Sequence, residues 1–149
     1  MIGDALRRHG CEVDVVPASH GVSLDGYDAV IVGGALYAGR WHRDAVRLVK
    51  GHRPQLHDTP VWLFSSGPLD SSADSGEIPP VRQVRRLMDR IAADGHQTFG
   101  GRLEFDAPGF MAHAMARMLA GDWRDPGHVK RWTSRIVDQL RHPVQAQAS

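Results

Sequence analysis

One stretch of the sequence, Tyr27 to Trp41 (YDAVIVGGALYAGRW), constrains the fold more than any other. It opens with an apolar run, Ala29 to Val32, whose β-branched residues are typical of a strand buried on both faces. The run stops at Gly33-Gly34, and small or aromatic residues follow as far as Trp41. Open α/β sheets bind flat ligands beyond the carboxyl ends of such strands. The stretch therefore predicts a buried parallel strand and a ligand loop. The alternative is that the glycines only turn the chain and the aromatic residues pack on a helix.

The composition limits the classes of function that the chain can have. Its 149 residues suit one domain, and its net charge of +1 provides no global field to recruit nucleic acid or an anionic membrane. A single cysteine, Cys11, excludes an internal disulfide and a multi-cysteine zinc site. The nine histidines are scattered singly, so we expect no metal site. No apolar run is long enough to cross a bilayer, and the N-terminus lacks the apolar core of a signal peptide. We therefore expect a soluble cytoplasmic protein without a nucleic-acid partner.

Hydrophobic periodicity predicts strands that alternate with helices along the chain. Besides the central strand, strands are expected over Cys11–Val16, Thr59–Ser66 and His96–Phe105, the last interrupted by Gly100-Gly101. Helices are expected over Met1–His9, His42–Leu56, Val81–Ile91 and Ala107–Ala120, where Gly10 ends the first and Gly95 closes the third. A last helix is expected to begin at Asp125-Pro126, and one of its faces carries Val129, Trp132, Ile136 and Leu140. This alternation predicts one α/β domain with a parallel sheet over residues 1–141, followed by a disordered tail over residues 142–149.

Two of these strands end in similar loops, which the carboxyl ends of neighbouring parallel strands would bring to one edge. Backbone amides of Gly33-Gly34 and Ser66-Gly67 are then placed to bind a heterocycle, with Tyr37 or Trp41 over its face. No serine lies in a nucleophile motif, and Cys11 begins a predicted strand at the wrong end of the sheet. We assign no catalytic residue; if the chain is an enzyme, a cofactor carries the chemistry.

Three segments together resemble the flavodoxin superfamily: YDAVIVGGALYAGRWH, TPVWLFSSGP, and FGGRLEFDAPGF with the tryptophans that follow it. The branch that they are most similar to includes the quinone-linked protoporphyrinogen oxidases of bacteria. The resemblance implies a doubly wound sheet of order 2-1-3-4-5 with FMN at the switch point. It implies that Gly34–Arg40 and Ser66–Leu69 contact the flavin, and that Phe105–Asp122 lies near the flavin and the electron partner. The cofactor-binding residues implied are Gly34, Ala35, Leu36, Tyr37, Ala38, Gly39, Trp41, Ser66, Gly67 and Pro68.

The sequence departs from this family at its N-terminus. The family begins with a strand and a Ser/Thr/Gly-rich loop that holds the FMN phosphate at a helix N-terminus. Here Met1 already lies within the helical pattern. Our hypothesis is an N-terminally truncated flavodoxin-like sequence whose first strand is absent. Such a chain would be marginally stable, prone to aggregate at open strand edges, and able to bind FMN only weakly or not at all.

The resemblance implies an FMN-binding redox protein that transfers electrons, with protoporphyrinogen oxidation as one reaction. An enzyme of this kind would be an FMN-dependent oxidoreductase of the protoporphyrinogen oxidase type. The alternative is a truncated, non-catalytic α/β module that binds FMN poorly or folds only with a partner. A redox partner protein or a quinone is the expected partner, and a homo-oligomer would form through the open sheet edge.

Two helical stripes in the sequence have alternative interpretations. The arginines after the second loop would dock an acidic electron-transfer partner or form a solvated helix face. The methionine-rich segment Phe110–Leu119 would touch a membrane surface, or pack as a lid on the sheet. The stripe of arginines consists of Arg82, Arg85, Arg86 and Arg90.

Overall fold

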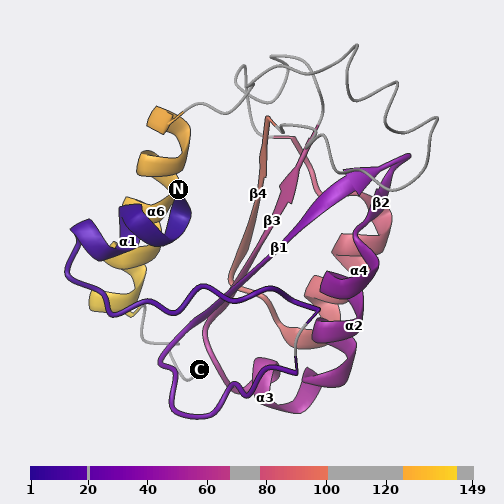
Figure 1. Cartoon of the computed structure of the whole chain (residues 1–149), viewed down its shortest axis with the longest axis horizontal. Coiled ribbons are helices and arrows are strands. Elements are labelled where there is room, and N and C mark those ends of the chain that lie inside the picture. Colours follow the sequence, from indigo (N-terminus) through magenta and orange to yellow (C-terminus); the bar gives the residue numbers. More distant parts are fainter. Residues whose placement is uncertain (20, 68–77, 101–125, 144–149) are drawn as a thin grey trace, which may run out of the picture. The chain divides into compact units, whose positions relative to one another are not determined.

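The computed structural model describes residues 1–19, 21–67, 78–100 and 126–143 (Figure 1). The chain divides into two compact units, which are Met1–Val15 with Asp125–Ser149, and Val16–Arg124. The helix expected over Ala107–Ala120 and the tail residues 144–149 lie outside the described residues.

The larger unit is built on a four-stranded sheet of order β2-β1-β3-β4. Strands β1, β3 and β4 are parallel to one another, whereas β2 pairs with β1 in the antiparallel sense. The bounds of the strands are β1 Val30–Tyr37, β2 Arg40–Trp41, β3 Val61–Ser66 and β4 Gly95–Phe99. This mostly parallel, open sheet confirms the predicted α/β class. The strand expected over Thr59–Ser66 is confirmed as β3.

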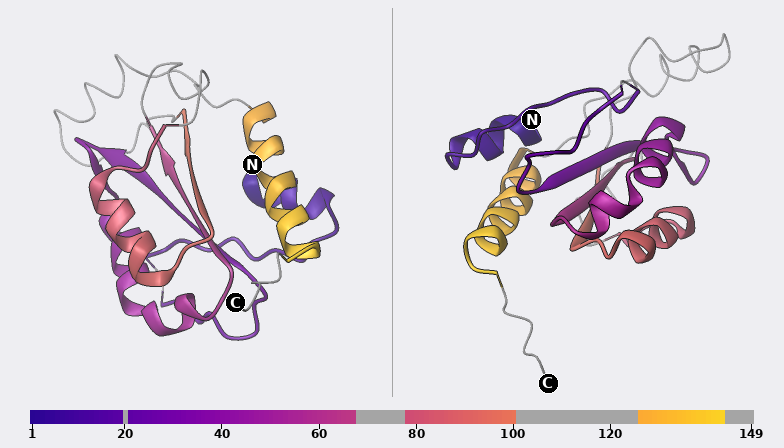
Figure 2. Two further views of the ribbon diagram at one scale, coloured as in Figure 1. Left: turned by 180° about the vertical axis from the view of Figure 1, so that it is seen from behind. Right: turned by 90° about the horizontal axis from the view of Figure 1, so that it is seen from below.

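One face of this sheet is covered by three helices, α2 (Arg43–Gly51), α3 (Arg53–His57) and α4 (Arg82–Ile91) (Figures 1 and 2). Side chains of a strand alternate between faces, so every second residue of β1 and β3 points toward the helices. The core between sheet and helices contains Val32, Trp41, Ala45, Val49, Leu56, Val61, Leu63, Val84, Leu87 and Ile91. We call this side of the sheet the helix-covered face, and the other side the second face.

The single helix expected over His42–Leu56 is wrong, because the chain breaks at His52 into α2 and α3. Pro54 lies in the first turn of α3, where its missing N–H costs nothing. The His52 ring lies 3.0 Å from the Leu48 carbonyl and 2.8 Å from the Val22 carbonyl. The ring therefore ties the end of α2 to the segment that precedes β1.

Helix α4 confirms the helix expected after the second loop, but it does not end at Gly95. Ala92 ends it in the left-handed conformation, with φ of 50°, and Gly95 is the first residue of β4. Asp94 joins these elements: its carboxylate accepts a hydrogen bond from the Val61 amide at 2.8 Å, and its own amide donates to the Val61 carbonyl at 2.7 Å.

The smaller unit pairs α1 (Ile2–Arg8) with α6 (Pro126–Arg141) (Figure 1). Both helices were predicted from the sequence. Ala5 and Leu6 are the buried residues of α1, and the buried residues of α6 are Val129, Trp132, Thr133, Ile136 and Val137. Polar contacts join the two helices: the Arg141 guanidinium donates to the His9 carbonyl at 2.8 Å, and the His9 ring lies 3.2 Å from the Ser134 hydroxyl. Gly10, at φ of +85°, lies just beyond the end of α1.

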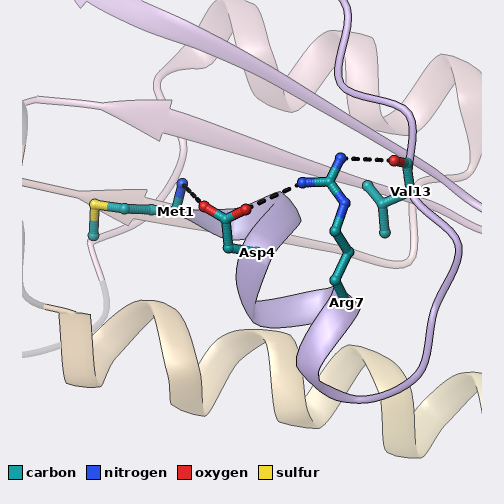
Figure 3. Close-up of polar contacts among 4 residues, drawn as sticks. All are labelled: Met1, Asp4, Arg7 and Val13. Atoms are coloured by element: carbon teal, nitrogen blue, oxygen red, sulfur yellow. Dashed lines mark hydrogen bonds and ion pairs between the residues drawn. The ribbon is translucent and has the colours of Figure 1, made fainter.

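A chain of polar contacts organises the N-terminal helix (Figure 3). The Asp4 carboxylate lies 3.5 Å from the Met1 ammonium and 3.1 Å from the Arg7 guanidinium, and these cations, the ammonium first, lower the pKa of Asp4. The same guanidinium donates to the Val13 carbonyl at 2.8 Å. Arg7 therefore connects α1 to the segment that follows it.

The strand predicted over Cys11–Val16 is wrong, since the segment contains no strand residues. Alternating apolar residues make a strand favourable only where a neighbouring strand supplies ladder hydrogen bonds. Here the Val13 carbonyl is bonded to an arginine, and Val15 and Val16 are exposed. The alternating sequence favours a strand, but no neighbouring strand among the described residues pairs with this segment.

Candidate functional site

The predicted end of the central strand at Gly33-Gly34 is wrong, because β1 continues through both glycines to Tyr37. It then turns through Ala38 and Gly39 into β2, and Leu36 pairs with Trp41 across this hairpin. The His42 amide donates to the Ala35 carbonyl at 2.9 Å and extends the pairing. The residues that the sequence assigns to a flavin loop therefore form the end of a strand and a tight turn.

The two glycines admit aromatic rings on opposite faces of the strand. A Cβ on Gly33 would lie 1.9 Å from Cζ of Phe64, so this ring lies directly against the glycine on the second face. A Cβ on Gly34 would lie 2.7 Å from Nε1 of Trp41 on the helix-covered face. Glycine is thus required at each position, because any side chain there would clash with the ring packed against it.

Strand alternation divides the predicted cofactor-binding residues between the two faces. Ala35 and Tyr37 lie on the second face, and Ser66 is the register partner of Ala35 on β3. Ala35 and Tyr37 are exposed, Tyr37 to 56%, and Ser66 is half-buried. We call these three residues the Tyr37 patch. On the helix-covered face lie Gly34, Leu36 and Trp41.

Trp41 belongs to the hydrophobic core and not to an exposed ligand surface. Its side chain is only 3% exposed, and its indole N–H donates to the Phe64 carbonyl at 3.2 Å. Its backbone amide donates to the side-chain oxygen of Gln83 on α4 at 2.9 Å. The expectation that Trp41 covers a bound ring is therefore replaced by the packing alternative, and Tyr37 is the exposed aromatic residue of this hairpin.

The hairpin turn carries backbone strain at one residue. Ala38 has φ of 50° and Gly39 has φ of 72°, the combination that a tight two-residue hairpin requires. Glycine adopts this conformation freely, whereas an alanine pays about 1–2 kcal/mol for it. Both residues are exposed, and no atom stands within 4 Å of a Cβ placed on Gly39. Ala38 is therefore held in the left-handed region by the hairpin pairing.

The second predicted loop meets the first at Gly67. This glycine has φ of 137°, and a Cβ on it would lie 3.4 Å from the Leu36 side chain. Its amide donates to the Phe99 carbonyl at 2.8 Å, so it continues the β3–β4 ladder and is not free for a heterocycle as the sequence suggested. The two loops are thus neighbours at the carboxyl edge of the sheet. Pro68 and Leu69 lie outside the described residues.

A part-buried serine–histidine pair on the helix-covered face was missed by sequence reasoning. The Ser65 hydroxyl lies 2.9 Å from Nε2 of His96, and Ser65 is completely buried. Burial lowers the pKa of His96 to about 4. The neutral ring can accept the hydroxyl proton at Nε2. A polar residue at the fifth position of the apolar strand β3 was the only sequence signal for this pair, and a completely buried hydroxyl is unsuited to attack a substrate.

The described parts of the chain hold neither a metal-ligand cluster nor a membrane-spanning helix. No three histidine, cysteine, aspartate or glutamate side chains gather there as metal ligands would. No helix in those parts is long and apolar enough to cross a membrane.

Comparison with known proteins assigns the chain to a family. A family model described as a flavodoxin domain matches residues 1–127, while curated proteins and solved structures give no significant match. The match covers the parallel sheet, the Tyr37 patch and Gly67 together. On this evidence the chain belongs to the flavodoxin domain family.

Proposed function

We propose that this protein binds FMN at the carboxyl edge of its sheet and serves in electron transfer. The observation that carries the proposal is the Tyr37 patch, an exposed aromatic ring beside two small residues in a chain of the flavodoxin domain family. Bound FMN would supply the capacity to take up and release electrons.

The described residues fit the flavin ring system and not the whole cofactor. A planar ring requires a flat, small-residue surface and an aromatic neighbour, and Ala35, Ser66 and Tyr37 offer these. The turn at Ala38-Gly39 brings exposed backbone next to Tyr37. Leu36 and Gly67 support this surface by their contact with each other. Gly34 and Trp41 would act indirectly, because they hold the hairpin from the helix-covered face.

The described residues in this fit would contact the flavin ring and not the FMN phosphate, so the FMN affinity that we expect from them is low. The competing function is a non-catalytic module that retains the sheet and binds FMN poorly. The two differ in one measurable quantity, the dissociation constant for FMN. The reaction that we propose to test for a loaded protein is protoporphyrinogen oxidation, which comes from the family resemblance alone.

Quenching of FMN fluorescence on titration with the protein measures this dissociation constant. We expect saturable quenching, and we expect Tyr37→Leu to raise the dissociation constant about 2- to 12-fold, as the loss of ring stacking predicts. Tyr27→Leu is the matched control, since Tyr27 is also an exposed tyrosine and precedes the opposite end of β1.

Three results bear on this proposal. Equal effects of the Tyr37 and Tyr27 substitutions would remove the Tyr37 patch from the site. Absence of quenching would favour the non-catalytic module. Nanomolar binding would support the flavin function and contradict the expectation of weak binding.

A further inference from the structure

Positive charge is concentrated on the outer side of α2 and α4. The two helices carry seven basic side chains against two carboxylates, a surplus of five, although the whole chain has a net charge of only +1. The seven residues are Arg43, Arg47 and Lys50 of α2, and Arg82, Arg85, Arg86 and Arg90 of α4. All seven are exposed. We call this set the cationic face.

Helical spacing places these residues together on the side away from the sheet. In α2 the basic residues follow at intervals of four and three, opposite the buried Ala45 and Val49. In α4 Arg82, Arg86 and Arg90 follow at intervals of four, opposite the buried Val84, Leu87 and Ile91. The helices lie side by side on the same face of the sheet (Figure 1), so the two stripes form one surface.

The positive charge of this surface is not neutralised within the described residues. The ion pairs there are Met1–Asp4, Arg7–Asp4, His42–Asp44 and His57–Asp58, and none includes a residue of the cationic face. Like charges three or four positions apart on a helix repel each other. Six of the seven residues are arginines, whose planar guanidinium suits the two oxygens of a carboxylate.

The cationic face adjoins the hairpin that carries the Tyr37 patch. Helix α2 begins two residues after Trp41, and Gln83 in the first turn of α4 accepts the Trp41 amide at 2.9 Å. Both helix N-termini therefore lie at the hairpin, where their dipoles add to the positive potential. A partner on this face would therefore approach the hairpin from its helix-covered side, whereas Tyr37 points to the second face.

The surface also lacks the side chains that membranes and single-stranded nucleic acids use. The large apolar side chains exposed in the described residues are Met1, Val15, Val16, Tyr27 and Tyr37, and none of these lies on α2 or α4. Insertion into lipid and stacking of unpaired bases both depend on such groups. Binding of carboxylates on a protein surface requires only positive charges and hydrogen-bond donors, and the cationic face supplies both.

We propose that the cationic face docks a small acidic electron-transfer protein. The redox role of that partner rests on the proposed function, whereas docking does not, so binding is measured without added flavin. The probe is a plant-type [2Fe–2S] ferredoxin, an acidic redox protein, and cytochrome c is the basic counterpart. Isothermal titration calorimetry at low and at physiological salt gives the dissociation constants.

We expect the ferredoxin to bind and cytochrome c not to bind. The ferredoxin dissociation constant should rise about tenfold or more as salt screens the charges. Arg47→Glu with Arg86→Glu should raise it at least about tenfold, because both residues are central in their stripes. Arg8→Glu with Lys130→Glu removes the same charge from exposed positions of the smaller unit and should change it less than about twofold.

Folding of the variants is checked by far-ultraviolet circular dichroism and thermal unfolding. Arg86→Glu places a carboxylate between Arg82 and Arg90, so the substitution should not weaken α4. Equal losses for the two double variants would overturn the proposal. So would absence of ferredoxin binding at low salt, or tighter binding to duplex DNA or to phosphatidylserine vesicles than to the ferredoxin.

Discussion

The two faces of β1 near its carboxyl end differ although they come from the same few residues. On the helix-covered face Gly34 lies against Trp41, which is 3% exposed and bonded to both β3 and α4. On the second face Ala35 and Tyr37 are exposed. The comparison teaches that a strand can divide one sequence motif into a buried, structural half and a solvent-exposed half, because alternate residues of a strand point to opposite faces.

The largest effect expected from this comparison concerns its two aromatic residues. Trp41→Ala should lower the free energy of unfolding by about 3–5 kcal/mol, as truncation of a buried tryptophan does. Tyr37→Ala should change it by less than about 0.5 kcal/mol, since most of its surface is already in water. Urea unfolding followed by circular dichroism measures both values. Similar losses for the two variants would contradict the division of the motif.

The next effect concerns the ring packed against Gly33. Gly33→Ala places a methyl group 1.9 Å from the Phe64 ring, so the ring must move, and we expect a loss of about 1–3 kcal/mol in the free energy of unfolding. Gly51→Ala is the control: no atom lies within 4 Å of its Cβ, and alanine is favoured in a helix. A loss for Gly51→Ala as large as that for Gly33→Ala would remove the steric explanation.

A smaller effect follows from the histidine on the helix-covered face. The pKa of His96 is lowered to about 4 from 6.5, so below pH 6.5 the unfolded chain binds a proton that the folded chain does not. Stability should therefore fall as the pH decreases from 6.5 to 4, by about 1–2 kcal/mol after allowance for partial solvent access. His96→Asn should flatten this dependence, while His57→Asn, at an exposed position, should preserve it. A slope that persists in His96→Asn would assign the effect to another group.

The smallest effect tests the strained turn between the faces. Ala38→Gly relieves a left-handed alanine and should raise the free energy of unfolding by about 0.5–1 kcal/mol. Ala35→Gly, at a strand position without positive φ, should lower it by a similar amount. The same urea titrations compare them. If both substitutions destabilise the protein equally, the strain at Ala38 is not released by glycine.

The sequence correctly predicted the helices and strands whose own residues show a clear hydrophobic pattern. Continuous apolar runs such as Val61–Phe64 and regular stripes such as Val84, Leu87 and Ile91 appear in the structure as expected. Local signals failed where a distant group decided the outcome. Gly33-Gly34 was interpreted as the end of a strand. In the structure the glycines make room for the rings of Phe64 and Trp41, which lie 31 and 7 positions further along the chain and which no local pattern connects to them.

The sequence predicted that the two loops would lie together, but it did not predict on which face of the sheet each residue would lie. The two loops do meet, at Leu36 and Gly67. Trp41 was grouped with Tyr37 because both are aromatic and close in sequence, and only the hairpin shows that they belong to opposite faces. Cys11–Val16 failed for the converse reason, since alternation is a local property and a ladder partner is not.

The hydrogen bond from Trp41 to Gln83 has a kinetic consequence. Most strand amides are protected by the backbone of a neighbouring strand, but this amide is protected by a side chain from the first turn of α4. The first turn of a helix opens more easily than its middle, so the Trp41 proton should exchange with solvent whenever that turn opens. The exchange rate of this proton therefore reports how often the first turn of α4 opens. A partner that binds the outer side of this helix would slow the exchange without contacting the indole.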